Sequence, residues 1–138
     1  MTREDKQLLL ADLCARLPYG VKAQVIGWDK EKGEVEVPLR VYSMNTDGYV
    51  YFESNDYDVN YLAVDACRLY LRPMSSMTLE ELEEYRRFGD HIRDAECKTH
   101  IANYEQIDWL NKYHFDYRGL IPKGLAIEAP EGMYKVEE

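Results

Sequence analysis

Three residues in the C-terminal third of the chain have types that could carry out acid–base chemistry: His114, Asp116 and Arg118. If their segment is extended, they share one face, where a carboxylate could orient the imidazole as general acid–base catalysis requires. The plainer interpretation is an exit from a helix, in which Phe115 and Tyr117 fill the core while Asp116 and Arg118 bond to local backbone or to each other. We favour the plainer interpretation and keep a small enzyme built on the three residues as the alternative.

Other chemical signatures fail on spacing. His91, Cys97 and His100 offer nitrogen and sulfur to zinc, but their separations match no paired-ligand pattern and a fourth ligand has no source. Cys67 or Cys97 with a histidine is a formal nucleophilic pair that nothing in the sequence brings together. Phosphate-binding loops and the common hydrolase and metalloprotease motifs are missing from the sequence.

The segment from Asp56 to Asn60 copies the first three ligand positions of an EF-hand calcium loop, with Asp58 between them. The next position should be glycine but is Tyr61, and the position of the bidentate glutamate holds Cys67. We therefore expect an acidic surface loop, with no metal and no cofactor.

The stretch from Val41 to Cys67 contains no Lys or Arg but holds five acidic residues and five tyrosines. Tyrosine is enriched at protein interfaces, and carboxylates steer basic partners, so this stretch is the candidate binding surface. A structural alternative is that tyrosine suits strands and acids keep an exposed sheet face soluble; we favour it over the binding interpretation. The candidate binding residues are Asp47, Tyr49, Tyr51, Asp56 and Asp58.

Length and charge narrow the class of protein. The 138 residues are 46% hydrophobic and 31% charged, which predicts a single folded domain over residues 1–138. A net charge of −9 argues against direct nucleic-acid binding, and no apolar run is long enough for a membrane span or signal peptide. We expect a cytoplasmic protein whose cysteines are free thiols, with Cys14 and Cys67 among apolar neighbours.

Helix signals occur at both ends of the chain. Thr2 can cap a first helix, with Asp5 three residues later, and Pro18 and Gly20 end it. Thr78 with Glu81 is a capping box for a second helix, and a third helix is predicted over residues 104–113 behind the cap Asn103.

Between these helices the period of the apolar residues changes to two. Strands are predicted over 21–28, 34–42, 49–52 and 67–71, joined by turns at 29–33 and 45–48. Pro38 inside the second of these favours an edge strand or a bulge. The prediction is an α+β domain: an N-terminal helix, an antiparallel β-meander or small barrel, then two C-terminal helices, dividing into residues 1–77 and 78–138.

Several motifs appear in an ordered set: LCARLPYGV at 13–21, YLRPMSSMT at 70–78, DWLN at 108–111 and HFDYRGLI at 114–121. Together they resemble a group of small proteins of gut Bacteroidales that are often encoded in phage-like or mobile regions. The chain departs from the group at Arg72, where the usual pattern has Phe or a similar residue. The resemblance implies an accessory protein of a phage or mobile element and carries no activity.

The function predicted from these observations is a non-catalytic accessory or protein-binding module whose partner is a protein. The enzyme described above is one alternative. A second is an acidic mimic of nucleic acid that binds a DNA-binding protein. The oligomeric state is left open by the sequence.

Overall fold

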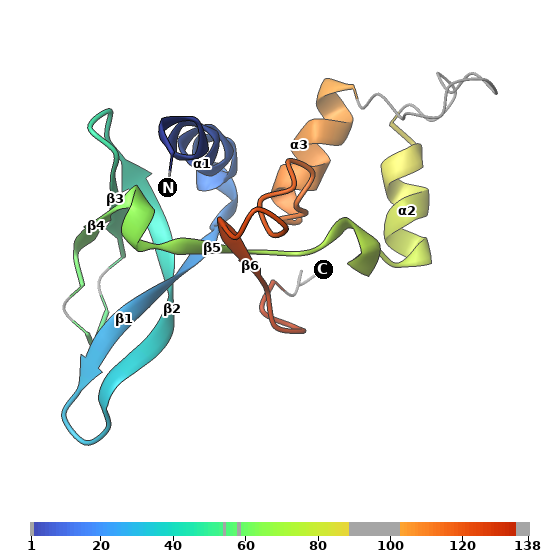
Figure 1. Cartoon of the computed structure of the whole chain (residues 1–138). Helices are drawn as coiled ribbons and strands as arrows, with labels where there is room; N and C mark the ends of the chain where they lie inside the picture. Colours follow the sequence, from blue (N-terminus) through green and yellow to red (C-terminus); the bar gives the residue numbers. More distant parts are fainter. Residues whose placement is uncertain (1, 54, 58, 89–102, 135–138) are drawn as a thin grey trace.

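A computed structural model describes residues 2–53, 55–57, 59–88 and 103–134 of the chain (Figure 1). It has an N-terminal helix, a six-stranded mixed sheet and later helices, which confirms the predicted α+β class. The helices are α1 (Arg3–Arg16), α2 (Leu79–Arg86) and α3 (Tyr104–Lys112). The strands are β1 (Lys22–Asp29), β2 (Gly33–Met44), β3 (Tyr49–Phe52), β4 (Tyr61–Ala63), β5 (Arg68–Leu71) and β6 (Ala126–Glu128).

Helix α1 begins where its capping box predicts. The Thr2 hydroxyl accepts from the Asp5 N–H at 3.0 Å, and the Asp5 carboxylate accepts from the Thr2 N–H at 3.2 Å. Leu9 and Leu13 are buried against the sheet, as the helical stripe predicts. Cys14 is exposed, so the prediction that its side chain lies among apolar neighbours is wrong: it occupies the solvent side of the same helix.

The sheet order is β4-β3-β2-β1-β5-β6. Neighbouring strands from β1 to β4 pair antiparallel, but β5 then pairs with β1 on its free side, and β6 runs parallel to β5. The small barrel predicted as one possibility is therefore wrong. Because β5 and β6 extend the sheet beyond β1 instead of returning to β4, the two ends of the sheet never meet.

Pro38 lies inside the strand order, since β2 has β1 on one side and β3 on the other. However, β3 pairs with β2 only from Val41 to Met44, whereas Pro38 lies opposite Gln24 of β1. The Val41 N–H donates on the β1 side, so by strand alternation the position of the missing N–H at Pro38 faces the opposite side of β2, where β3 does not reach it. An irregularity in register follows between Val41 and Ser43.

The two faces of the sheet differ in burial. One face packs under α1 and forms the main core with Val25, Val41 and Val50 among its members. The other face leaves Ile26 and Trp28 of β1 about two-thirds exposed. Figure 1 shows α1 on one side of the strands, with α2 and α3 beyond β5 and β6.

The C-terminal part has its own apolar cluster, in which Tyr85 of α2 packs with Trp109 of α3 and with Phe115. Both helices begin at their predicted caps, Thr78 and Asn103, and at each of them the structure shows a capping box. The chain after α3 then returns to the sheet as β6. Among the described residues, the helices are too short and too polar to cross a bilayer.

Candidate functional site

Four tyrosines form an exposed cluster on the open face of the sheet, which we call the tyrosine cluster: Tyr42, Tyr49, Tyr51 and Tyr61. The ring centroids of Tyr42 and Tyr51 are 6.4 Å apart, and those of Tyr51 and Tyr61 are 5.8 Å apart. Tyr49 meets Tyr61 edge-on at 5.8 Å. These are favourable aromatic separations, so the rings hold one another in place.

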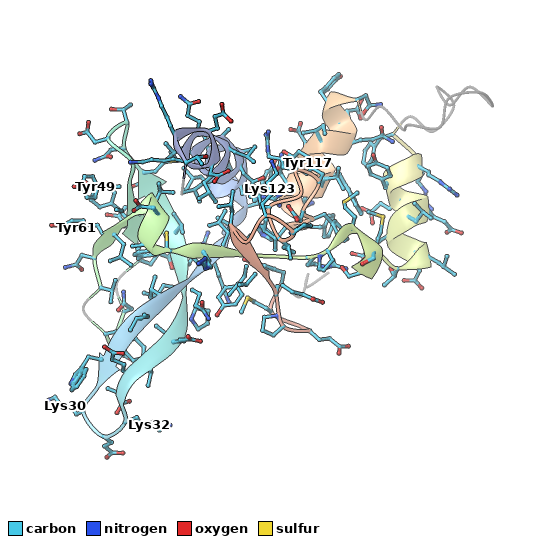
Figure 2. The ribbon with its side chains drawn as sticks, in the orientation of Figure 1. Lys30, Lys32, Tyr49, Tyr61, Tyr117 and Lys123 are labelled. Carbon is cyan, nitrogen blue, oxygen red and sulfur yellow. The ribbon has the colours of Figure 1, made fainter. Side chains whose placement is uncertain are left out.

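Strand pairing explains why the four rings meet. Tyr51 lies opposite Tyr61 in the β3–β4 register, and Tyr49 shares their face because it is two residues from Tyr51. Tyr42 lies on the same face by strand alternation, because its neighbour Val41 is buried opposite Phe52 on the other face of the sheet. Figure 2 shows Tyr49 and Tyr61 extending from β3 and β4 on the side away from α1.

Solvent access is what distinguishes this cluster from a core. Tyr42 and Tyr61 are each 57% exposed, and Tyr49 is 42% exposed. Tyr51 is half-buried, and its hydroxyl accepts a hydrogen bond from Asn45 Nδ2 at 3.2 Å. The fifth tyrosine of the base-free stretch, Tyr57, instead packs against Gly27.

The structure describes two of the three acidic residues that were predicted to bind a partner. Asp47 is exposed in the β2–β3 turn, where the Asn45 side chain accepts from the N–H groups of Asp47 and Tyr49. Asp56 is also exposed, and Asp58 lies outside the described residues. Lys6 of α1 lies against Gly48, so a base from elsewhere in the sequence lies close to this turn, on the side that α1 covers.

His114 is buried, with 3% of its surface exposed, and its Nε2 donates to the Tyr19 carbonyl oxygen at 3.0 Å. Because that oxygen can only accept, the proton lies on Nε2. Burial, then the positive charge of Arg16, lowers the pKa of His114 from 6.5 to about 4. His114 is therefore a neutral, hydrogen-bonded group at pH 7, held at φ 61° in the turn that ends α3.

Asp116 and Arg118 have other partners. The carboxylate of Asp116 accepts from the Leu120 and Ile121 N–H groups at 2.8 and 2.9 Å, so it caps the following turn. Arg118 pairs with Asp12 of α1. The segment is a turn with one bridge residue instead of an extended strand, so the three side chains do not share a face. These contacts agree with the plainer interpretation of the segment.

A buried ion pair in α1 was not anticipated from the sequence. Asp12 and Arg16 are fully buried, and two guanidinium nitrogens of Arg16 donate to the carboxylate at 2.8 and 3.1 Å. The same Nη2 donates to the Phe115 carbonyl oxygen at 2.6 Å, while Arg118 Nε approaches Asp12 at 3.2 Å without hydrogen-bond geometry. The i,i+4 spacing was a visible signal, although it also describes exposed pairs.

The remaining predicted groups form no site among the described residues. Cys67 is buried, and burial, then the nearby Asp65, raises the pKa of its thiol to about 12, which makes it a poor nucleophile. His91, Cys97 and His100 lie outside the described residues. Within the described ranges, no three His, Cys, Asp or Glu side chains are grouped as metal ligands would be.

Comparisons with family models, with curated proteins and with solved structures found no match to this chain.

Proposed function

We propose that the protein is a non-catalytic binding module that holds a basic protein partner on its tyrosine cluster. The observation that carries this proposal is a row of four tyrosine rings, each close to the next, of which Tyr42, Tyr49 and Tyr61 are open to solvent. Tyrosine side chains supply large apolar contact area with few rotatable bonds, and they are frequent hot spots of protein interfaces.

The charge around the cluster indicates the chemistry of the partner. Asp47 and Asp56 are exposed in loops of the same stretch, and the chain carries a net charge of −9. Such a field attracts a basic surface and repels nucleic acid, so the partner is a protein with Lys and Arg around an apolar centre. An origin in a phage or mobile element, which the sequence resemblance implies, is part of this proposal.

The test compares variants of the cluster with matched changes elsewhere. Host lysate is passed over immobilised wild type, over Tyr49→Ala/Tyr61→Ala and over the control Tyr104→Ala, which removes a tyrosine that is 77% exposed on α3. A captured protein is then purified and titrated against each variant. We expect the double variant to weaken its binding roughly tenfold or more, as loss of interface anchors does, with Tyr104→Ala unchanged.

Charge reversal provides the second arm. Asp47→Lys should weaken binding and reduce its salt dependence, whereas Glu83→Lys on the exposed face of α2 should not. The proposal is refuted if every captured protein binds the tyrosine variant as tightly as the wild type.

A further inference from the structure

A second surface feature, which shares no residue with the tyrosine cluster, is a pocket of about 340 Å³ between the sheet and the C-terminal part, which we call the basic pocket. Its lining includes Lys22, Arg40, Lys112 and His114, and none of the described residues that line it is acidic. In a chain with 26 acidic and 17 Lys or Arg residues, such a lining sets this pocket apart from the rest of the surface.

Strand pairing places two of the cations side by side. Lys22 lies directly opposite Arg40 in the β1–β2 register. Gly20, at φ +72°, lets the Arg40 guanidinium lie against the backbone, since a Cβ at this position would be 3.0 Å from Nε. The Tyr134 hydroxyl accepts from the Lys22 N–H at 2.8 Å and donates to the Tyr70 carbonyl oxygen at 2.8 Å. The start of β1 is thereby fixed to the chain that closes the pocket.

The existing partners of these cations are weak enough for a ligand to replace. Arg40 pairs with Glu53 at 3.5 Å, but both side chains are about half exposed. The Lys112 ammonium lies 5.6 Å from the ring centroid of Tyr113, an exposed cation–π contact. Arg40 and Lys112 would form stronger charge-assisted hydrogen bonds with a doubly charged anion than they form with their present partners.

His114 adds an unused acceptor to the lining. Its Nε2 donates to the Tyr19 carbonyl oxygen, and within the described residues its buried Nδ1 has no hydrogen-bond partner. The Tyr134 ring covers the imidazole at 4.0 Å between centroids. The imidazole is therefore a neutral part of the wall, and the positive charge of the lining comes from Lys22, Arg40 and Lys112.

We propose that the basic pocket binds the phosphate group of a small molecule. Arginine presents a planar fork that matches phosphate oxygens, and lysines add the remaining positive charge. The volume is at the low end of small-molecule sites, which favours a compact ligand over a polymer. A carboxylate would use fewer of the available donors and would bind more weakly.

The test is an NMR titration of the ¹⁵N-labelled protein with ribose 5-phosphate, inorganic phosphate, ribose and acetate. We expect both phosphates to shift the amide signals of Gly20, Lys22 and Arg40, with acetate and ribose far weaker. Tighter binding of ribose 5-phosphate would identify a phosphate ester as the source, and equal binding would identify free phosphate; either supports the phosphate site. Acetate binding as tightly as phosphate would overturn the proposal.

Two variants check the location. Lys22→Gln/Arg40→Gln should weaken phosphate binding roughly tenfold or more, because two charge-assisted contacts are lost. Lys30→Gln removes the same kind of charge at the exposed tip of the β1–β2 hairpin (Figure 2) and should leave binding unchanged. Circular dichroism confirms that each variant is folded. If the double variant binds phosphate as tightly as the wild type, the proposed phosphate site is wrong, while the proposed function of the tyrosine cluster is not contradicted.

Discussion

Replacing Asp12 with Asn should be among the most damaging single changes of charge in this protein. The substitution keeps the shape of the side chain but removes the negative charge that faces Arg16 and Arg118. Asp12 and Arg16 are completely buried, so water cannot solvate the guanidinium charge that the substitution leaves without its carboxylate partner. Breaking a buried pair by removing one partner costs about 3–5 kcal/mol, a large share of the stability of an ordinary domain.

The assay is urea unfolding followed by circular dichroism and by tryptophan fluorescence. With a urea dependence of about 2 kcal/mol per molar, the loss corresponds to a midpoint lowered by about 1.5–2.5 M. The matched control is Glu53→Gln, which breaks the exposed pair with Arg40 at 3.5 Å and should cost about 0–1 kcal/mol.

A double variant separates charge from packing. Asp12→Leu/Arg16→Met removes both buried charges and should recover part of the loss, since apolar residues of similar volume replace buried pairs well. The stability loss that remains in the double variant measures the cost of leaving the Phe115 carbonyl oxygen without its donor, about 1–3 kcal/mol. If Asp12→Asn unfolds at the same urea concentration as Glu53→Gln, the reasoning from burial is refuted.

Three further changes test other parts of the structure. In the native protein, iodoacetamide should modify exposed Cys14 and leave buried Cys67 unmodified until urea unfolds the chain, as peptide mass spectrometry would show. His114→Asn, which tolerates the positive φ, should remove about 3 kcal/mol of pH-dependent stability between pH 6.5 and 4, measured by urea unfolding at each pH. Arg72→Phe should keep the contact with Phe115 but cost about 1 kcal/mol at pH 7, because Glu81 loses a two-point ion pair.

The sign of each pH effect follows from the direction of its pKa shift. The pKa of His114 is lower in the folded protein, so the unfolded chain binds the proton more tightly and stability falls as the pH drops from 6.5 to 4. The hydrogen bond from Arg72 lowers the pKa of Glu81, so the contribution of this ion pair to folding stability also falls at acid pH. That pH dependence should be smaller in Arg72→Phe. Unchanged pH profiles in the two variants, or rapid modification of native Cys67, would contradict these assignments.

Local signals in the sequence predicted the three helices and strands β1, β2, β3 and β5, because caps and apolar periods act over a few residues, but they did not predict the three-residue strands β4 and β6. Thr2, Thr78 and Asn103 each begin a helix where their capping boxes place it. The order of the strands could not be read in this way. The pairing of β5 with β1, and of β6 with β5, joins residues far apart in the chain, and the strand sequences would serve equally in a barrel.

In the candidate surfaces, too, local features could be predicted from the sequence and contacts between distant segments could not. The tyrosines were visible in the composition, and strand alternation places Tyr42 on the exposed face, whereas the pairing of β3 with β4 that brings Tyr61 beside Tyr51 could not be predicted from a local pattern. The basic pocket was missed because its cations come from three separate segments of an acidic chain. Asp12 and Arg16 were overlooked because their spacing also suits an exposed helix, and their burial depends on contacts with residues 115–118, about a hundred positions later in the chain.

The bond between Arg16 and the Phe115 carbonyl has a consequence for the order in which the chain folds during synthesis. The two residues are 99 positions apart, so the first helix and the strands that follow it are made long before the acceptor exists. A nascent chain can pair β1 with β2 early, but its arginine must stay hydrated until the last quarter of the sequence emerges. Completion of the fold is thus tied to a late event, and fragments that lack Phe115 should remain open and vulnerable to proteases.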